Sequence, residues 1–256
     1  MHWFDSHCHF DIDKKETVSA TLASSREAGV LEFLVQGTNM ENCPFVVELA
    51  ERETGAYAAV GMHPHDAEKP YDLGLLRELW QHEKVLAVGE IGLDYFYDFA
   101  PRESQRAMFA VFLQEAVTAK LPVIIHCREA VQDGLQIVKD NLPKGHPFEV
   151  HSFSGTEDEA AQWLEMGAMM SINGMVTFKK AENIRRILEL IPNERLLLET
   201  DTPYLAPVPL RGQENTPANI PIIGKYVAEL RGIAPEEMAR LTTENTHRFL
   251  NIQDEV

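Results

Sequence analysis

The sequence predicts an α/β protein that forms a single (β/α)8 barrel of the TIM type. Two observations predict this fold. Short apolar runs rich in β-branched residues recur along the 256 residues, and segments with helical periodicity separate most of them. Eight such units in a chain of about 250 residues are typical of a closed parallel barrel, whereas an open doubly wound sheet is the alternative.

The predicted elements follow the apolar pattern in chain order. The expected strands are His2–His7, Leu31–Thr38, Tyr57–His63, Val85–Glu90, Pro122–His126, Phe148–His151, Ala168–Gly174 and Leu196–Asp201. The expected helices are Glu16–Ala28, Cys43–Thr54, Glu103–Lys120, Ala130–Asn141, Asn183–Leu190, Ile220–Arg231 and Pro235–Phe249. Gly29 and Gly55 follow helical segments as stop signals, and Pro101 and Pro235 stand at helix starts. Because no linker or repeat interrupts the pattern, residues 1–256 are expected to form one domain.

Composition restricts the class of protein. With 23 basic and 40 acidic residues, the net charge is −17, so the chain is not expected to hold long duplex nucleic acid by charge alone. The absence of an apolar run of about 18 residues argues against a membrane span. Three widely spaced cysteines and the lack of a signal-peptide pattern favour a cytoplasmic protein with free thiols.

Imidazoles and carboxylates stand at the carboxyl ends of most predicted strands. A barrel brings these ends to one face, where barrel enzymes keep their active sites. Both side-chain types are accepted ligands of Zn²⁺ and similar ions, so their joint placement predicts a metal centre. The converging residues are His7, His9, His63, Glu90, His126, His151 and Asp201. The residues expected to be structural instead are His2, His82, His146 and His247.

The number of candidate ligands indicates two divalent ions. One ion needs three or four side chains, so six good ligands suggest two ions that share a bridging group, for which Glu90 on a central strand is the natural candidate. Zn²⁺, Mn²⁺, Ni²⁺, Co²⁺ and, less comfortably, Mg²⁺ are compatible with mixed nitrogen and oxygen ligands. Strand alternation turns Cys8 and Cys127 away from the metals, so both thiols are expected to pack.

With these residues in place, the chain resembles the TatD-type metal-dependent hydrolases of the amidohydrolase-like superfamily. The matching stretches are "FDSHCHFD" (4–11), "GMHPH" (61–65), "VGEIGLDYF" (88–96), "PVIIHCREA" (122–130), "HSFSG" (151–155), "LLLETDTPYLAP" (196–207) and "NTPANIP" (215–221). The resemblance extends from about residue 3 to "ENTHRFL" (244–250). Many dinuclear superfamily members bridge their metals with a carbamylated lysine on strand four, where this chain has Glu90.

The resemblance implies how the candidate ligands are shared between two metal ions. His7, His9 and Asp201 match the ligands of one ion. His126 and His151 match those of the second ion, and Glu90 matches the bridging group. This assignment accounts for six of the converging side chains.

Further roles also come from the resemblance. His63 and Arg128 match positions that approach the substrate phosphate, and Asp201 matches the residue that takes a proton from the attacking water. Asp94 and Glu199 are expected behind the ligands, where they hold the ligands in orientation. For Arg128, the structural alternative is a salt bridge to Glu129 or Asp133. For His63, the structural alternative is a role in the turn before Pro64.

The implied function is a metal-dependent deoxyribonuclease of the 3′-end exonuclease type. A metal-activated water would cleave the phosphodiester, and the acidic surface favours a DNA end or a short oligonucleotide over duplex DNA. No membrane and no obligatory protein partner are indicated. Hydrolysis of another ester or amide, such as an aminoacyl-tRNA ester, and a non-catalytic scaffold stay open. Tyr95, Phe96 and Tyr204 could stack a base, but loop packing is the preferred interpretation.

Overall fold

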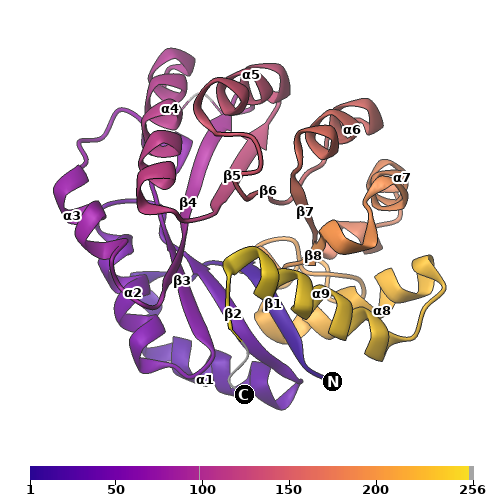
Figure 1. Ribbon diagram of the computed structural model, residues 1–256. Coiled ribbons are helices and arrows are strands. Elements are labelled where there is room, and N and C mark those ends of the chain that lie inside the picture. Colours follow the sequence, from indigo (N-terminus) through magenta and orange to yellow (C-terminus); the bar gives the residue numbers. More distant parts are fainter. Residues whose placement is uncertain (98, 254–256) are drawn as a thin grey trace.

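Eight parallel strands form a nearly closed barrel in the computed structural model, which describes residues 1–97 and 99–253 (Figure 1). Each strand pairs in parallel with the next along the chain. Backbone contacts of Thr202, which follows the last strand, with Cys8 and His9 join the two ends of the sheet. The strands are β1 Trp3–Cys8, β2 Val30–Gln36, β3 Ala56–Val60, β4 Val85–Asp94, β5 Val123–Arg128, β6 Phe148–Val150, β7 Met169–Ile172 and β8 Leu196–Leu198. The predicted fold class is confirmed.

The helices surround the strands, as Figure 1 shows. The α-helices are α1 Lys15–Glu27, α2 Asn42–Arg52, α3 Leu73–Leu79, α4 Arg102–Ala119, α5 Val131–Asn141, α6 Glu157–Met166, α7 Glu182–Leu190, α8 Ile220–Arg231 and α9 Pro235–Leu250. Short 3-10 turns are η1 Ile12–Lys14, η2 Pro64–Asp66, η3 Gly174–Thr177, η4 Asn193–Arg195 and η5 Pro217–Asn219. Over the described part of the chain, no helix is both long and apolar enough to cross a membrane. The predicted domain limit at residue 256 lies outside the described residues.

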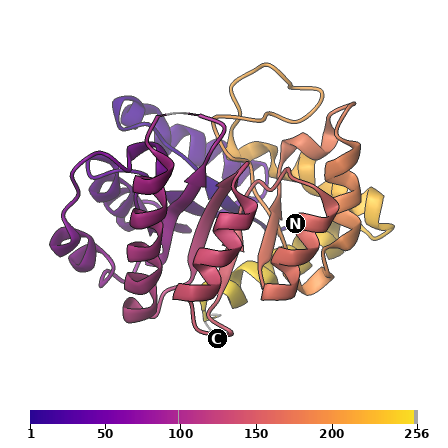
Figure 2. The same ribbon diagram turned by 90° about the horizontal axis from the view of Figure 1, so that it is seen from above.

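Two apolar layers hold the barrel together. The larger layer lies between the strands and the outer helices, and it contains Cys8 of β1 and Trp163 of α6. A smaller cluster joins residues of β1, β2, β3, β4, β5 and β8, and Phe249 and Leu250 at the end of α9 belong to it. α9 therefore covers one end of the barrel. The long loop between β8 and α8 projects beyond the opposite end (Figure 2).

Two helices, α3 and α6, were not predicted from the sequence. Asp72 caps α3 by accepting hydrogen bonds from the backbone of Gly74 and Leu75. α6 starts with a capping box, in which Thr156 and Glu159 satisfy each other's backbone N–H. The Thr-x-x-Glu pattern was readable in the sequence, but the acidic first turn weakens the apolar periodicity on which the prediction relied.

Several strand ends differ from the prediction. β3 ends at Val60 and β8 at Leu198, so His63 and Asp201 lie on the loops that follow instead of on the strands. His63 is the N-cap residue of the η2 turn, and its side chain accepts a hydrogen bond from the backbone N–H of His65. β4 instead continues to Asp94, four residues past its predicted end. Loop geometry at the rim, and not strand geometry alone, therefore sets several site positions.

Candidate metal centre

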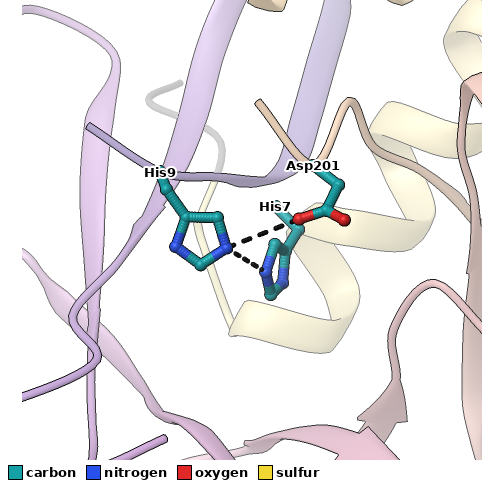
Figure 3. A group of neighbouring side chains, drawn as sticks. All are labelled: His7, His9 and Asp201. Carbon is teal, nitrogen blue, oxygen red and sulfur yellow. Dashed lines mark hydrogen bonds and ion pairs between the residues drawn. The ribbon is translucent and has the colours of Figure 1, made fainter. Parts of the chain in front are cut away.

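The first group of candidate ligands lies where β1 meets β8. The Nε2 atoms of His7 and His9 are 3.1 Å apart, and His9 Nε2 is 3.5 Å from Asp201 Oδ1 (Figure 3). Oε2 of Glu90 lies 3.3 Å from the first of these nitrogens and 3.4 Å from the second. Asp201 has a left-handed backbone with φ of 56°, which aspartate tolerates better than most residues. Its N–H donates to the His7 carbonyl at 2.9 Å, so β1 fixes the position of this loop.

The second group lies on β5 and directly after β6, on the other side of Glu90. Oε1 of Glu90 is 2.9 Å from His126 Nδ1 and 2.9 Å from His151 Nε2. The two ring nitrogens are themselves 3.2 Å apart. The two oxygens of this one buried carboxylate therefore face different groups of imidazoles. A carboxylate that bridges two cations requires this arrangement.

A carboxylate lies behind each imidazole of the second group. Both ring nitrogens of His126 face carboxylate oxygens: Nε2 lies 3.0 Å from Asp94 Oδ2, and Nδ1 lies 2.9 Å from Glu90 Oε1. Burial lowers the pKa of His126, but hydrogen bonding to these two carboxylates outweighs burial and raises it. His151 Nδ1 is 3.6 Å from Glu199 Oε2, and Glu199 accepts hydrogen bonds from Ser171 and Asn173. Both acids lie where the sequence predicted them, behind the candidate ligands.

His63 also faces the cluster but differs from the other imidazoles in its hydrogen bonding. Its Nδ1 accepts from the His65 backbone N–H at 3.2 Å, so the neutral ring carries its proton on Nε2. That Nε2 lies 3.5 Å from Glu90 Oε1. Burial lowers the pKa of His63 to about 4, so the ring is neutral at pH 7. His63 is therefore suited to donate a hydrogen bond at the centre and unsuited to offer a lone pair to a metal.

The cluster has the electrostatics of a cation site. Burial raises the pKa of Glu90, but the surrounding imidazoles outweigh burial and hold it well below its usual value. Burial lowers the pKa of His7, whereas the neighbouring carboxylates raise that of His151 despite its burial. Among the described residues, Nδ1 of both histidines is buried and makes no hydrogen bond, and Glu199 Oε2 lies 3.6 Å from Nδ1 of His151. A charged carboxylate among closely opposed ring nitrogens is a donor set that fits divalent cations.

Three overlapping groups of side chains are close enough to surround a metal ion, although the hydrogen bond at Nδ1 of His63 disfavours that residue as a ligand. Within each group the ligand atoms lie within 4.8 Å of one another. The groups are His7, His9 and Asp201; His7, Glu90 and His151; and His63, Glu90 and His126. The first two groups share His7 and the last two share Glu90, so all seven residues that the sequence singled out form one cluster.

Arg128 extends from the end of β5 toward solvent. Its guanidinium carbon lies 3.9 Å from the ring centroid of Phe96. Asp133, one alternative partner, instead contacts Arg106 at 3.2 Å and the Tyr95 hydroxyl at 2.5 Å. No carboxylate among residues 1–97 and 99–253 forms an ion pair with Arg128, so the alternative role of a salt bridge to Glu129 or Asp133 is not found there.

One residue of the cluster was missed by the sequence reasoning. His65 Nε2 lies 3.0 Å from Asp94 Oδ2, the same oxygen that His126 contacts. The motif "GMHPH" contained the signal, but only its first histidine was singled out. Two of the histidines that were expected to be structural lie away from the cluster and have other partners. His82 pairs with Glu51, and His146 contacts the Leu121 carbonyl.

The cysteines also behave as expected. All three are free thiols. Cys8 belongs to the outer apolar layer and its Sγ faces the Leu34 carbonyl, while Cys127 packs against the same layer. Burial raises the pKa of Cys127 to about 12, so this thiol stays protonated at neutral pH. Neither thiol is placed as a ligand.

Comparison with known proteins gives consistent matches over nearly the whole chain. Residues 4–251 match the family of TatD related DNases. The chain is 36% identical over 256 residues to the uncharacterized metal-dependent hydrolase YcfH of Escherichia coli strain K12, covering 98% of this chain and 97% of that protein. It is 36% identical over 247 residues to the 3'-5' ssDNA/RNA exonuclease TatD of Cronobacter sakazakii, covering 94% and 92%. The crystal structure of YjjV, a TatD homolog from E. coli K12, is similar with a TM-score of 0.89 at 33% identity, covering 98% of both chains.

Proposed function

The chain belongs to the TatD family of metal-dependent hydrolases, and from this premise we propose that it is a deoxyribonuclease that cleaves DNA from the 3′ end. The observation that carries the proposal is Glu90, whose two oxygens face two separate groups of imidazoles at the carboxyl ends of the barrel strands. The printed names of relatives such as the Cronobacter sakazakii exonuclease support a nucleic-acid substrate.

We assign the candidate ligands to two divalent ions. His7, His9 and Asp201 would hold one ion, and His126 and His151 the other. Glu90 would contribute one oxygen to each. When bound, the ions supply positive charge to the phosphoryl oxygens and lower the pKa of a water molecule toward neutrality. Zn²⁺, Mn²⁺, Ni²⁺, Co²⁺ and Mg²⁺ are the candidates.

The remaining chemistry is assigned to residues around the centre. Burial raises the pKa of Asp201, but nearby histidines outweigh burial and lower it, so the carboxylate is ionised and can accept the proton of the attacking water. His63 donates its Nε2 hydrogen to a phosphoryl oxygen. Arg128 offers a pair of parallel N–H groups that match the geometry of a phosphate.

The substrate is proposed to be a single-stranded end. A chain with net charge −17 repels the dense charge of a long duplex, whereas a local centre can hold one scissile phosphate. The free cysteines fit a location in the reducing cytoplasm.

A substrate panel tests the proposal. Purified protein whose metal content has been measured is incubated with 5′-labelled single-stranded DNA, RNA, an aminoacyl-tRNA and a small ester, each with the five candidate ions. We expect a ladder of DNA products shortened from the 3′ end. No DNA cleavage with any ion overturns the proposal, and hydrolysis of the aminoacyl ester alone supports the alternative esterase. Asp201→Asn with wild-type rates would overturn the role of Asp201 as base.

A further inference from the structure

An exposed group of aromatic side chains lies in the loop between β4 and α4. Phe96, Tyr97 and Phe99 have 49%, 39% and 65% of their surface exposed, and we refer to them as the aromatic patch. The loop follows the carboxyl end of β4, so the patch stands at the same rim as the candidate metal centre. Large exposed aromatic groups on a protein surface mark binding sites.

Asp94 connects the patch to the metal centre directly. Its Oδ1 accepts hydrogen bonds from the backbone N–H of Phe96 at 3.0 Å and of Tyr97 at 3.1 Å. Its Oδ2 lies 3.0 Å from His126 Nε2. One buried carboxylate therefore fixes both a candidate metal ligand and the backbone that carries the patch.

The rings of the patch support one another. Tyr97 and Phe99 stack with centroids 5.3 Å apart and an angle of 22° between ring planes. The His65 ring contacts Phe99 edge-on at 4.7 Å, and its Nε2 is held by Asp94. Phe99 is thus fixed by two ring contacts while most of its surface faces solvent. A pre-positioned ring loses little conformational entropy when it binds a ligand.

Arg128 adds a flat cation to the patch. Its guanidinium lies 3.9 Å from the Phe96 centroid and 5.1 Å from that of Tyr97. Stacking on the rings holds the guanidinium plane and leaves its N–H groups at the edge free to bind phosphate. Tyr95 is not part of this surface, because its hydroxyl binds Asp133.

We propose that the aromatic patch and Arg128 form a stacking subsite for an unpaired nucleobase of the substrate strand, adjacent to the phosphate that is cleaved. The inference rests on the proposed nuclease function and deepens it. Aromatic faces and guanidinium planes stack on any base. A base inside a duplex already uses both of its faces, so this subsite selects single-stranded ends with little sequence preference. For Phe96, which is 49% exposed, we therefore prefer base stacking to the loop packing that the sequence favoured.

Fluorescence of 2-aminopurine tests the stacking directly. A single-stranded decamer with 2-aminopurine near its 3′ end is titrated with wild-type protein in EDTA, where it is not cleaved. We expect saturable quenching, and an affinity about 5- to 100-fold weaker for Phe99→Ala and Phe96→Ala. Phe99→Tyr keeps an aromatic face and retains wild-type affinity. Leu230→Ala on α8, which removes a side chain that is 44% exposed, is the matched control and binds as wild type.

Cleavage kinetics give the second readout. The wild type is compared on normal strands and on strands with abasic sites next to the cleaved bond, and we expect a higher KM for the abasic strands with little change in kcat. Phe99→Ala should lose this preference. Equal KM values for both strands, or absent quenching alongside efficient cleavage, overturn the subsite and leave the nuclease intact. Quenching that depends on Phe99, but without cleavage by any ion, overturns the nuclease and supports the stacking.

Discussion

Both ends of the barrel gather imidazoles around one largely buried carboxylate, yet the two clusters differ in geometry. At the carboxyl ends of the strands, the two oxygens of Glu90 face separate groups of ring nitrogens. At the opposite end, His2 Nε2 and His247 Nε2 both lie 2.7 Å from the same oxygen of Glu32. The Tyr57 hydroxyl lies 3.4 Å from the other oxygen.

The difference separates a metal-type cluster from a hydrogen-bonded one. Around Glu32, each imidazole contacts the carboxylate at a distance typical of a strong hydrogen bond, and the His2 side chain is 45% exposed. Around Glu90, ring nitrogens also face one another at 3.1 and 3.2 Å. The same residue types are therefore arranged differently: each imidazole contacts one carboxylate oxygen around Glu32, whereas ring nitrogens also face one another around Glu90.

The largest effect is expected for a substitution of Glu90, the carboxylate at the centre of the metal-type cluster. Glu90→Gln removes the charge that both imidazole groups face, so we expect bound metal to fall below one ion per chain and DNA cleavage to fall more than about 100-fold. Metal is measured by elemental analysis and cleavage with labelled single-stranded DNA. Glu32→Gln is the matched control and should keep wild-type metal content. Equal metal loss in both variants would contradict the distinction between the two clusters.

An intermediate effect is expected behind the metal-type cluster. Asp94→Asn weakens the contact that orients His126, so we expect metal affinity or activity to fall about 10- to 100-fold while the fold persists. Competition with a chelator measures the affinity. Asp133→Asn, at a carboxylate that binds Tyr95 and Arg106, is the matched control. Wild-type affinity in Asp94→Asn would show that His126 is positioned by packing alone.

The smallest effect is expected for Glu32, the carboxylate of the hydrogen-bonded cluster, and it concerns the free energy of unfolding. Burial raises the pKa of Glu32, but hydrogen bonds from His2 and His247 outweigh burial and lower it. A lowered folded pKa stabilises the protein above the unfolded value of about 4.3, and this stability is lost as pH falls through the folded pKa. At pH 6 we expect Glu32→Gln to reduce the free energy of unfolding by about 1–3 kcal/mol. Urea unfolding at pH 6 and at pH 3 should show the difference shrinking at the lower pH.

A control at the surface completes this test. Glu51 pairs with His82, but its side chain is 56% exposed. Glu51→Gln should therefore change the free energy of unfolding by less than about 1 kcal/mol at either pH. If Glu32→Gln behaves the same way, or if its effect does not depend on pH, the Glu32 cluster contributes no ionic stabilisation.

Much of the barrel was predictable because its signals are local. Apolar runs of β-branched residues mark strands wherever both faces are buried. Gly29, with a positive φ, directly follows the C-cap of α1, whereas α2 already ends at Arg52, before the predicted stop at Gly55. The short helix α3 and the acidic start of α6 were missed, since neither shows a long apolar period. The strand ends near His63 and Asp201 were misplaced, because the loops there take their shape from neighbouring strands.

By itself, the sequence determined which side chains stand near the strand ends, because parallel strands of a barrel deliver their carboxyl ends to one rim. Only the tertiary structure decided how these side chains face one another. In the folded protein the two oxygens of Glu90 face different groups of imidazoles. The backbone N–H of His65 donates to Nδ1 of His63, so the proton of the neutral His63 ring is on Nε2, which faces the centre. The tertiary structure also aligned Asp94 of β4 with Arg128 of β5, which brought a cation onto the aromatic patch. Register and loop conformation depend on contacts between distant segments, and no local pattern records them.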